Sequence, residues 1–185
     1  MAVEKGNEML YIGIDPGLTG AVAAIDNEYG AVMFWDTPII EMTKTKKKTV
    51  VDVISGKAAG KKTKRDFLPA QMAQILAQFS PPCHVWIEKV GAMPGQGVTS
   101  MFGFGKGFGM WLGVIAALKI PYTEVPPQTW KKVIMSGIHD KDAYRLQAQR
   151  LFPQCTKDLS RKMDNGRADA LLIAEYGRRV SPSAG

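Results

Sequence analysis

The stretch "YIGIDPGLTGAVAAID", from Tyr11 to Asp26, decides how the chain folds. An apolar run ends in the charged Asp15, a Pro-Gly turn follows, and a second apolar run begins at once. A third short run, residues 30–35, comes after the turn signal "NEYG". This pattern predicts a three-stranded antiparallel meander over residues 9–15, 20–26 and 30–35. Asp15 closes the first strand, and a charge at that point needs a reason beyond the strand itself.

Helical and strand patterns alternate along the rest of the chain. Apolar spacing predicts helices over residues 66–79, 110–119, 126–135, 141–152 and 167–179, and short apolar runs predict strands over 84–88 and 122–125. A Gly-rich segment fills residues 91–109. This order predicts an α/β fold with a mixed five-stranded sheet flanked by helices. The chain has 185 residues and no visible second-domain boundary, so we expect a single domain spanning residues 1–185.

Charge indicates an anionic partner. Lys and Arg number 24 against 17 Asp and Glu, which gives a net charge of +7 and favours nucleic acid without establishing it. Nine of the 24 basic residues lie within residues 44–65, with Asp52 as the only acid, and we expect a mobile basic insertion there. Cys83 and Cys155 do not make a disulfide framework and are expected to pack in the core. No apolar segment reaches the roughly 20 residues of a membrane helix, so no membrane association is expected.

Carboxylates carry the chemistry that the sequence predicts. Glu88 ends a second predicted strand as Asp15 ends the first, and Asp164 and Asp169 flank "NGRA" at the last helix. Four carboxylates at one sheet edge would repel each other unless cations neutralised them, and oxygen ligands select Mg²⁺ or Mn²⁺. Positions five apart on a helix point about 140° away from each other, so Asp164 must lie in a turn before the helix and Asp169 in its first turn. The alternatives are a turn cap for Asp15 and a helix N-cap for Asp164.

Nucleophilic catalysis has little support in the sequence. His84 begins an apolar strand and is expected to be structural, and His139 lies in the loop "GIHD", where a solvated role is more usual. Neither cysteine has a histidine nearby in sequence. The glycines of "GFGKGFG" follow no strand directly and lack the lysine spacing of a P-loop.

Four motifs in this order resemble the RuvC-type Holliday-junction resolvases. They are "IGIDPGLTGA", "VWIEKV", "FGFGKGFGMWLGVI" and "DNGRADALLIA", and the likeness runs from about Met9 to Tyr176. The resemblance implies an RNase H-like fold, a homodimer, and metal-dependent cleavage of four-way junction DNA with Mg²⁺, for which Mn²⁺ could substitute, and with no small-molecule cofactor. Within the family, "AMPGQG", "PPQTWKK" and the Asp-four-residues-Asp ending look closest to the chloroplast resolvases of land plants.

The resemblance also implies roles for individual residues. Asp15, Glu88 and Asp169 match the invariant acidic positions, and Asp164 takes the fourth, although bacterial relatives place that ligand where this chain has Gly166. Lys131 and Lys141 match basic positions near the scissile phosphate, with ordinary solvated helix charge as the alternative. The implied catalytic set is Asp15, Glu88, Asp164, Asp169 and Lys131, of which the four acids are the metal ligands. The expected DNA contacts are Lys141, Lys132, Met101, Phe102, Lys106, Lys61 and Lys62.

One family feature is missing from its usual place. Bacterial relatives carry an aromatic wedge three residues after the glutamate, where this chain has Gly91. Met93, Met101, Phe102 and Phe104 of the Gly-rich segment could insert between base steps instead. Core packing is the alternative for Phe104 and Phe108, which are four residues apart.

We therefore expect an endonuclease that resolves Holliday junctions during DNA recombination and nucleoid segregation. Two alternatives remain open: a catalytically inactive junction-binding protein, and an ATPase of the actin and sugar-kinase type, which would want a second phosphate loop. The opening residues resemble neither a signal peptide nor a transit peptide. If the plant resemblance holds, the expected location is the chloroplast nucleoid with the transit peptide removed; otherwise it is the cytoplasm.

Overall fold

The centre of the molecule is a mixed five-stranded sheet, seen in a computed structural model that describes residues 9–45, 54–55, 61–91, 95, 97–136 and 141–181. Its strands are β1 (Leu10–Asp15), β2 (Ala21–Asp26), β3 (Val32–Asp36), β6 (Cys83–Glu88) and β7 (Tyr122–Val125), in the order β3-β2-β1-β6-β7. β1 pairs antiparallel with β2 and parallel with β6, and β6 pairs parallel with β7. The predicted meander and mixed five-stranded sheet are confirmed.

Both faces of this sheet are buried, because successive side chains of a strand point to opposite faces. On β1, Tyr11 joins one apolar cluster whereas Ile12 and Ile14 join the other. β2 divides in the same way, with Ala23 on the first side and Val22 on the second. The near-continuous apolar runs of the sequence are thus explained by burial on two sides.

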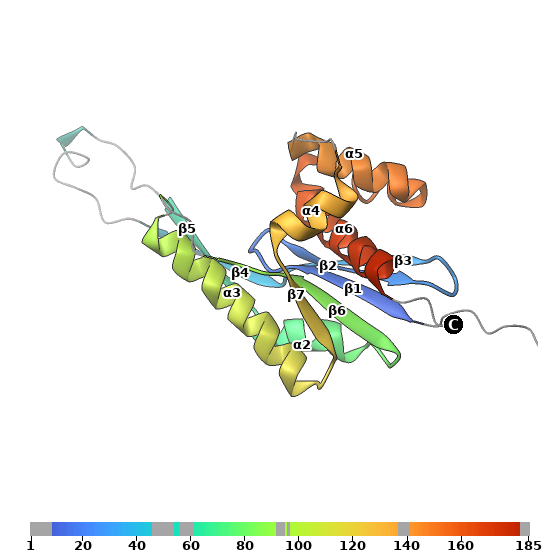
Figure 1. Cartoon of the computed structure of the whole chain (residues 1–185). Helices are drawn as coiled ribbons and strands as arrows, with labels where there is room; N and C mark the ends of the chain where they lie inside the picture. Colours follow the sequence, from blue (N-terminus) through green and yellow to red (C-terminus); the bar gives the residue numbers. More distant parts are fainter. Residues whose placement is uncertain are drawn as a thin grey trace, which may run out of the picture.

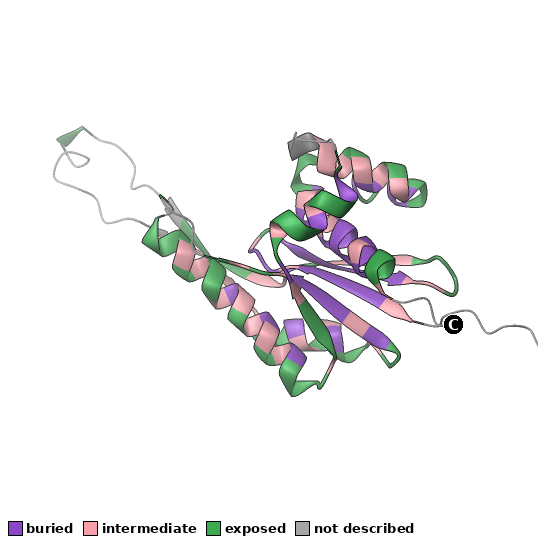
Figure 2. Ribbon diagram, in the orientation of Figure 1, coloured by how far each residue is buried: buried purple, intermediate pink, exposed green. Residues whose placement is uncertain are grey.

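Helices cover the two faces separately (Figures 1 and 2). The first face carries α6 (Asn165–Val180), packed directly on β1 and β2, with α4 (Pro127–Ile134) and α5 (Lys141–Leu151) beside it. The second face carries α2 (Pro69–Ala77) and α3 (Val98–Ala117). Two short 3₁₀ turns, η1 (Pro153–Cys155) and η2 (Lys162–Asp164), connect α5 to α6. Cys83 and Cys155 are both buried and free, as predicted.

Glycines allow α6 to lie close against the sheet. A Cβ at Gly13 would come within 2.0 Å of the Ala170 carbonyl oxygen, and one at Gly177 within 2.3 Å of the Trp86 ring. Either position with a side chain would push the helix away from the strands. The close approach buries Trp86, which also stacks on Tyr11 with ring centroids 5.5 Å apart.

A separate two-stranded sheet differs from the sequence prediction. β4 (Ile39–Thr45) pairs antiparallel with β5 (Lys61–Phe67), so both ends of the predicted basic insertion are strands of a hairpin, while residues 46–53 and 56–60 lie outside the described part. In Figure 1 the hairpin extends away from the central sheet beside the start of α3. The side chain of Asp66 pairs with the Lys106 ammonium, which ties the base of the hairpin to α3.

The start of α3 also differs from the prediction. The sequence places a Gly-rich segment before a helix at residue 110, whereas the helix begins at Val98. Each glycine destabilises a helix by about 1 kcal/mol relative to alanine, which is why the Gly-rich residues were not predicted to be helical. Here Gly107 allows close contact instead, because a Cβ at that position would lie 2.3 Å from the Phe67 ring. None of the helices in the described part of the chain is both long enough and apolar enough to cross a membrane.

Candidate active site

Asp15 and Glu88 lie next to each other at the edge of the central sheet. β1 and β6 run parallel and in register, with Ile14 opposite Ile87. Each strand ends one residue later, in its acid. The charge that interrupts "YIGIDPG" therefore stands beside a second charge contributed from about 70 residues further along the chain, as predicted.

The N-terminal half of α6 brings Asp169 to the same edge. Gly20 and Gly166 form an isolated β-bridge, which places the start of α6 against the turn between β1 and β2. A Cβ at Gly166 would lie 2.1 Å from the Thr19 carbonyl oxygen, so no side chain fits there. The position at which bacterial relatives hold an acidic ligand is thus closed to any ligand by backbone contact.

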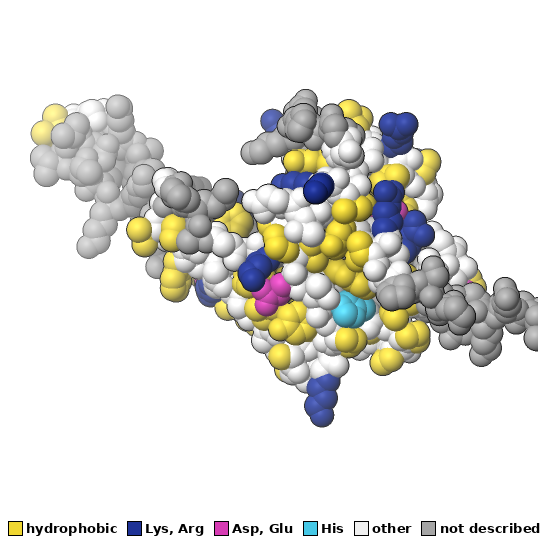
Figure 3. Space-filling view, viewed as in Figure 1, with side chains coloured by type: hydrophobic (Ala, Val, Ile, Leu, Met, Phe, Trp, Pro, Cys, Tyr) yellow, Lys and Arg dark blue, Asp and Glu magenta, His cyan; other side chains and the backbone are white. Residues whose placement is uncertain are grey.

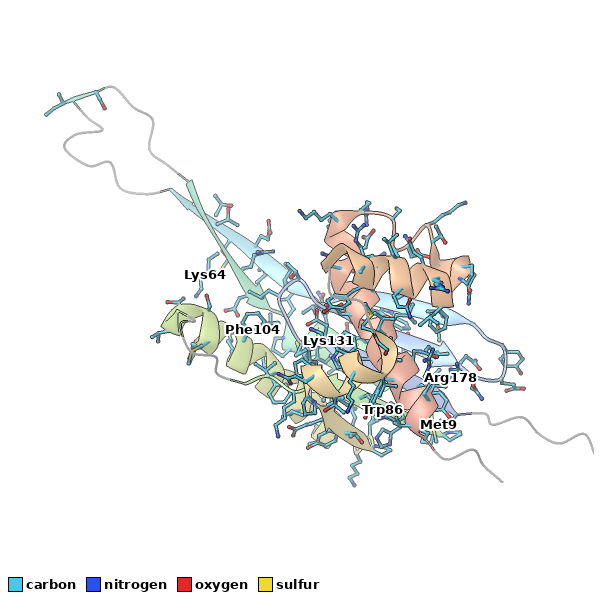
Figure 4. All side chains as sticks on the ribbon, turned by 45° about the horizontal axis from the view of Figure 1, so that its top comes forward. Met9, Lys64, Trp86, Phe104, Lys131 and Arg178 are labelled. Carbon is cyan, nitrogen blue, oxygen red and sulfur yellow. The ribbon has the colours of Figure 1, made fainter. Side chains whose placement is uncertain are left out.

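These three carboxylates line one cleft with a volume of about 640 Å³. Its other walls come from the turn after β1, from β5 and from the first turns of α3. In the view of Figure 4, Phe104 of α3 lies between Lys64 of β5 and Lys131 of α4. The lining residues are Asp15, Gly17, Leu18, Thr19, Arg65, Glu88, Thr99, Ser100, Gly103, Phe104 and Asp169.

Electrostatics in the cleft disfavour a charged Asp15. The pKa of Asp15 is raised from 3.8 to about 6, chiefly by burial and also by the nearby Glu88 carboxylate. A backbone N–H of Gly17, which donates to Asp15 Oδ1 at 3.1 Å, and the Lys131 ammonium act in the opposite direction. A cation bound between the carboxylates would remove the main cost of this arrangement.

Glu88 and Lys131 are both in contact with the ring of Trp130. The Trp130 indole N–H donates to Glu88 Oε1 at 3.0 Å. The Lys131 ammonium lies 5.1 Å from the centroid of the Trp130 ring and 5.1 Å from that of Tyr144. The two rings lie on α4 and α5, and their centroids are 6.0 Å apart. Lys131 is therefore held near the carboxylates, whereas Lys132 is exposed.

Asp164 does not lie among the residues of the cleft. It closes η2 directly before α6, as the spacing argument required, but its side chain is buried in a capping box with Arg161. The Arg161 backbone N–H and guanidinium donate to it at 2.7 and 2.8 Å. Burial alone would raise the pKa of Asp164, but these hydrogen bonds outweigh it and lower that pKa. Asp164 stands at the N-cap position of α6, but its side chain makes no capping hydrogen bond to that helix and binds Arg161 at the start of η2 instead. Its carboxylate is paired there and is not brought to the other three.

The residues predicted to contact DNA differ in their exposure to solvent. Phe102 has a side chain 74% exposed, Met101 is half-buried, and Phe104 lies in the wall of the cleft, 45% exposed. Lys106 is paired with Asp66 and lowers the pKa of that carboxyl, so the Lys106 ammonium already has an anionic partner within the protein. Lys61 and Lys62 belong to β5 and Lys141 to α5, but their side chains lie outside the described residues, as does Met93.

The donor chemistry of the cleft fits a hard divalent ion, although the ligands are not assembled around one point. Oxygen-only carboxylate sites select Mg²⁺ or Mn²⁺. Across the described ranges no group of three His, Cys, Asp or Glu side chains is arranged so that it could hold a metal ion. An ion in this cleft would therefore be held by pairs of carboxylates, or would draw Asp15, Glu88 and Asp169 together.

Sequence reasoning missed several groups that the fold places in or beside the cleft. Arg65 was counted only within the basic insertion, yet it lines the cleft together with the carboxylates. Thr99 and Ser100 come from a helix turn that the Gly-rich pattern concealed. The apolar spacing around Trp130 predicts only that the residue is buried, and does not indicate that its indole N–H donates to Glu88. Only the position of "TWKK" beside the two predicted basic residues could have drawn attention to it.

Comparison with solved structures identifies the class of fold. RuvC of T. thermophilus, in a structure described as a complex with a Holliday junction substrate, matches with a TM-score of 0.53 at 14% identity, over 95% of this chain and 98% of that chain. A second Thermus thermophilus RuvC structure matches at 16% identity with a TM-score of 0.49. The chain has the RNase H-like fold of the RuvC-type resolvases, and the predicted fold class is confirmed.

Sequence comparison then gives a particular relative. The chloroplastic Holliday junction resolvase MOC1 of Chlamydomonas reinhardtii is 28% identical over 153 residues. The match covers 78% of this chain but only 17% of that protein, so the chain spans a small part of its curated relative. No protein-family model matches the chain. The resemblance to the RuvC-type resolvases, and to a chloroplast member among them, is confirmed by these two comparisons.

Proposed function

We propose that this protein is a divalent-metal-dependent endonuclease that cleaves four-way DNA junctions. The observation that carries the proposal is the cleft in which Asp15, Glu88 and Asp169 meet at one sheet edge. Burial and mutual repulsion make this acidic cluster unfavourable without a cation, as the raised pKa of Asp15 indicates. The similarity to a chloroplast Holliday junction resolvase supports four-way junctions as the substrate.

The residues in and beside the cleft would have different roles in phosphodiester hydrolysis. Bound Mg²⁺ or Mn²⁺ would lower the pKa of a water molecule and stabilise charge on the phosphate and the leaving oxygen. Asp15, Glu88 and Asp169 would hold the ions, and Lys131 would place a positive charge where the non-bridging oxygens become more negative. Arg65, which also lines the cleft, offers a guanidinium fork that matches a phosphate group.

Charge elsewhere supports a DNA substrate. The net charge is +7, and on the face in Figure 3 Lys and Arg side chains appear over several elements while Asp and Glu occupy little area. The basic residues 44–65, including Lys61 and Lys62, and also Lys132 and Lys141, would contact phosphates without reading sequence. Phe102 and Met101 remain the proposed apolar contacts with exposed bases.

A homodimer is part of the proposal, because two symmetric cuts in a two-fold junction need two active sites. The sequence makes the apolar helix over residues 109–118 the candidate interface, through Met110, Trp111, Val114 and Leu118. The structure corrects part of this set. Trp111 is fully buried within its own subunit, and Met110 and Val114 pack on the same core. The outer face of α3 that remains available is formed by Gly105, Gly109 and Gly113, which have open space where a Cβ would lie. A mass of 20.2 kDa at micromolar concentration, with full cleavage activity, would contradict a dimer.

The cellular role follows as a further part of the proposal. Junction cleavage would serve DNA recombination and the segregation of nucleoids, and the chloroplast relative favours a chloroplast location. A fluorescent fusion of the full-length protein in its own host would test this: signal in plastid nucleoids supports the location, and diffuse cytoplasmic signal contradicts it.

The test of the function uses an end-labelled four-way junction. We expect symmetric cuts with Mg²⁺ or Mn²⁺, none with EDTA, and little cleavage of a linear duplex of the same sequence. Asp15→Asn should bind the junction without cutting it, which separates a nuclease from a contaminant. Binding without cleavage by the unaltered protein in either metal would favour the inactive junction-binding alternative, and ATP hydrolysis without cleavage would favour the ATPase alternative.

A further inference from the structure

Trp130 combines two contacts that no other described residue makes. Its side chain is fully buried, on the inner side of the first turns of α4. The indole N–H donates to Glu88 Oε1 at 3.0 Å, and the face of the same ring lies 5.1 Å from the Lys131 ammonium. One rigid ring therefore contacts both an acid and a base of the candidate active site.

Local sequence fixes where this ring stands. Val125 ends β7 at the sheet edge opposite Glu88, with which it is in register. Pro127 begins α4 two residues later, at a helix position where proline is favoured. The first turn of α4 thus starts beside the carboxyl end of β6, and its buried face presents the indole to Glu88. Tyr144 of α5 packs against the Trp130 ring and forms the second aromatic wall around Lys131.

The chemistry of this contact differs from the one made by Asp164. Asp164 is bound by a guanidinium, which neutralises its charge as well as orienting it. An indole N–H is a neutral donor that has no acceptor atom of its own. It orients the Glu88 carboxylate through Oε1 but leaves its negative charge for a cation. A neutral donor at this point therefore suits a carboxylate that must bind a metal ion in a fixed orientation.

We propose that Trp130 is a positioning residue of the nuclease site: its N–H orients Glu88 toward the metal, and its ring, with that of Tyr144, holds Lys131 toward the phosphate. The inference rests on the proposed function, since it assigns Glu88 to a metal. It concerns orientation alone, because Trp130 does not line the cleft.

The chain offers a matched control in Trp111. It is also fully buried, but its indole Nε1 has no hydrogen-bond partner among the residues that the structure describes. Trp130→Phe and Trp111→Phe each remove one buried N–H and shrink one buried ring. A purely structural role allows the two substitutions to differ in thermal stability, since only Trp130 loses a hydrogen bond, but it predicts that neither changes the metal requirement. A positioning role predicts that only Trp130→Phe changes the metal requirement.

The first experiment observes the indole N–H groups directly, without DNA. In the ¹⁵N-labelled protein, the Trp130 and Trp111 signals are identified by their loss in the two Phe variants. Titration with Mg²⁺ should shift the Trp130 signal while the Trp111 signal stays in place. The shift should be absent in Glu88→Ala. Equal shifts of the two signals, or a Trp130 signal that Mg²⁺ does not move, would overturn the inference.

The second experiment measures single-turnover junction cleavage as a function of Mg²⁺ concentration. Loss of an outer-shell partner typically costs 10- to 100-fold in metal affinity or activity, so Trp130→Phe should raise the half-saturating Mg²⁺ concentration by about 10-fold. Trp111→Phe should leave it unchanged, and both should bind the junction normally. Tyr144→Leu should lower the rate at saturating Mg²⁺ without changing the half-saturating concentration, whereas Tyr144→Phe keeps the ring and the rate. An unchanged metal requirement in Trp130→Phe would overturn the positioning role.

The two experiments also separate the inference from the function on which it rests. If the unaltered protein does not cleave junctions, the proposed function fails. The shift of the Trp130 signal needs no cleavage, so it still decides whether the indole reports on a metal at Glu88.

Discussion

Replacing Asp15 by asparagine should stabilise the metal-free protein at neutral pH while abolishing cleavage. Burial raises the pKa of Asp15 from 3.8 to about 6 in the folded state. Between these two values the folded protein binds more protons than the unfolded chain, so stability falls as pH rises. Two pKa units correspond to about 3 kcal/mol at 1.36 kcal/mol per unit. The full penalty is present above pH 6 and absent below about pH 4.

Asparagine removes the penalty at little structural cost. Its side-chain oxygen can still accept the Gly17 N–H that now donates to Asp15 Oδ1 at 3.1 Å. In EDTA at pH 7.5, Asp15→Asn should therefore be more stable than the unaltered protein by up to about 3 kcal/mol. The difference should shrink to near zero at pH 4. Added Mg²⁺ should stabilise the unaltered protein and have less effect on the variant.

Urea unfolding at the two pH values, with and without Mg²⁺, measures these differences. Asp26→Asn is the matched control, because Asp26 also ends a strand and accepts a backbone N–H two residues later, but in an exposed turn. It should change stability little at either pH. If Asp15→Asn is destabilised equally at pH 7.5 and pH 4, Asp15 is an ordinary turn cap and the electrostatic reasoning is wrong.

Three further predictions concern the lysines and one glycine. Lys131→Ala should slow single-turnover cleavage of a saturated junction by about 100-fold, on the scale of losing one electrostatic donor. Substitution of its exposed neighbour, Lys132→Ala, should leave the cleavage rate unchanged. Equal losses of rate in the two variants would make Lys131 a binding residue. Neutralising Lys46, Lys47, Lys61 and Lys62 together should weaken binding to junction and duplex alike and reduce the dependence of affinity on salt concentration. An unchanged slope of log affinity against log salt would rule out phosphate contacts by these lysines. Gly177→Ala gains about 1 kcal/mol of helix propensity but forces a Cβ to within 2.3 Å of the Trp86 ring. Overpacking costs about 1–3 kcal/mol, so thermal unfolding should show net destabilisation, and a stabilised variant would show that the ring moves freely.

The sequence was sufficient to predict the central sheet and the pairing of Asp15 with Glu88. Their strands are short apolar runs with turns on either side, and parallel strands place their carboxyl ends at one edge. Burial on both faces made these runs strongly apolar and therefore easy to find. The prediction succeeded because local pattern and tertiary environment agree at these positions.

The hairpin and the start of α3 could not be predicted in the same way. β4 and β5 pair only with each other among the described strands, so β5 shows little apolar alternation in "KKTKRDF". α3 contains five glycines within Gly103–Gly113, four of them at alternate positions, and such a pattern of poor helix formers predicts a loop. The close approach of Gly107 to Phe67 and to the Pro16 carbonyl oxygen favours the helix, and that contact depends on a hairpin that the pattern did not reveal.

Asp164 shows why residue type and spacing do not suffice to define a metal ligand. Three of the four acids differ in what already binds them: a backbone N–H at Asp15, a neutral indole at Glu88, and a guanidinium at Asp164. Only the last partner cancels a full charge. For Asp164 to join a metal, the ion would have to replace Arg161, whose side chain is 60% exposed and could move into solvent. The charge that a cation must neutralise therefore lies first on the carboxylates of the cleft, and Asp164 could add to them only after this exchange.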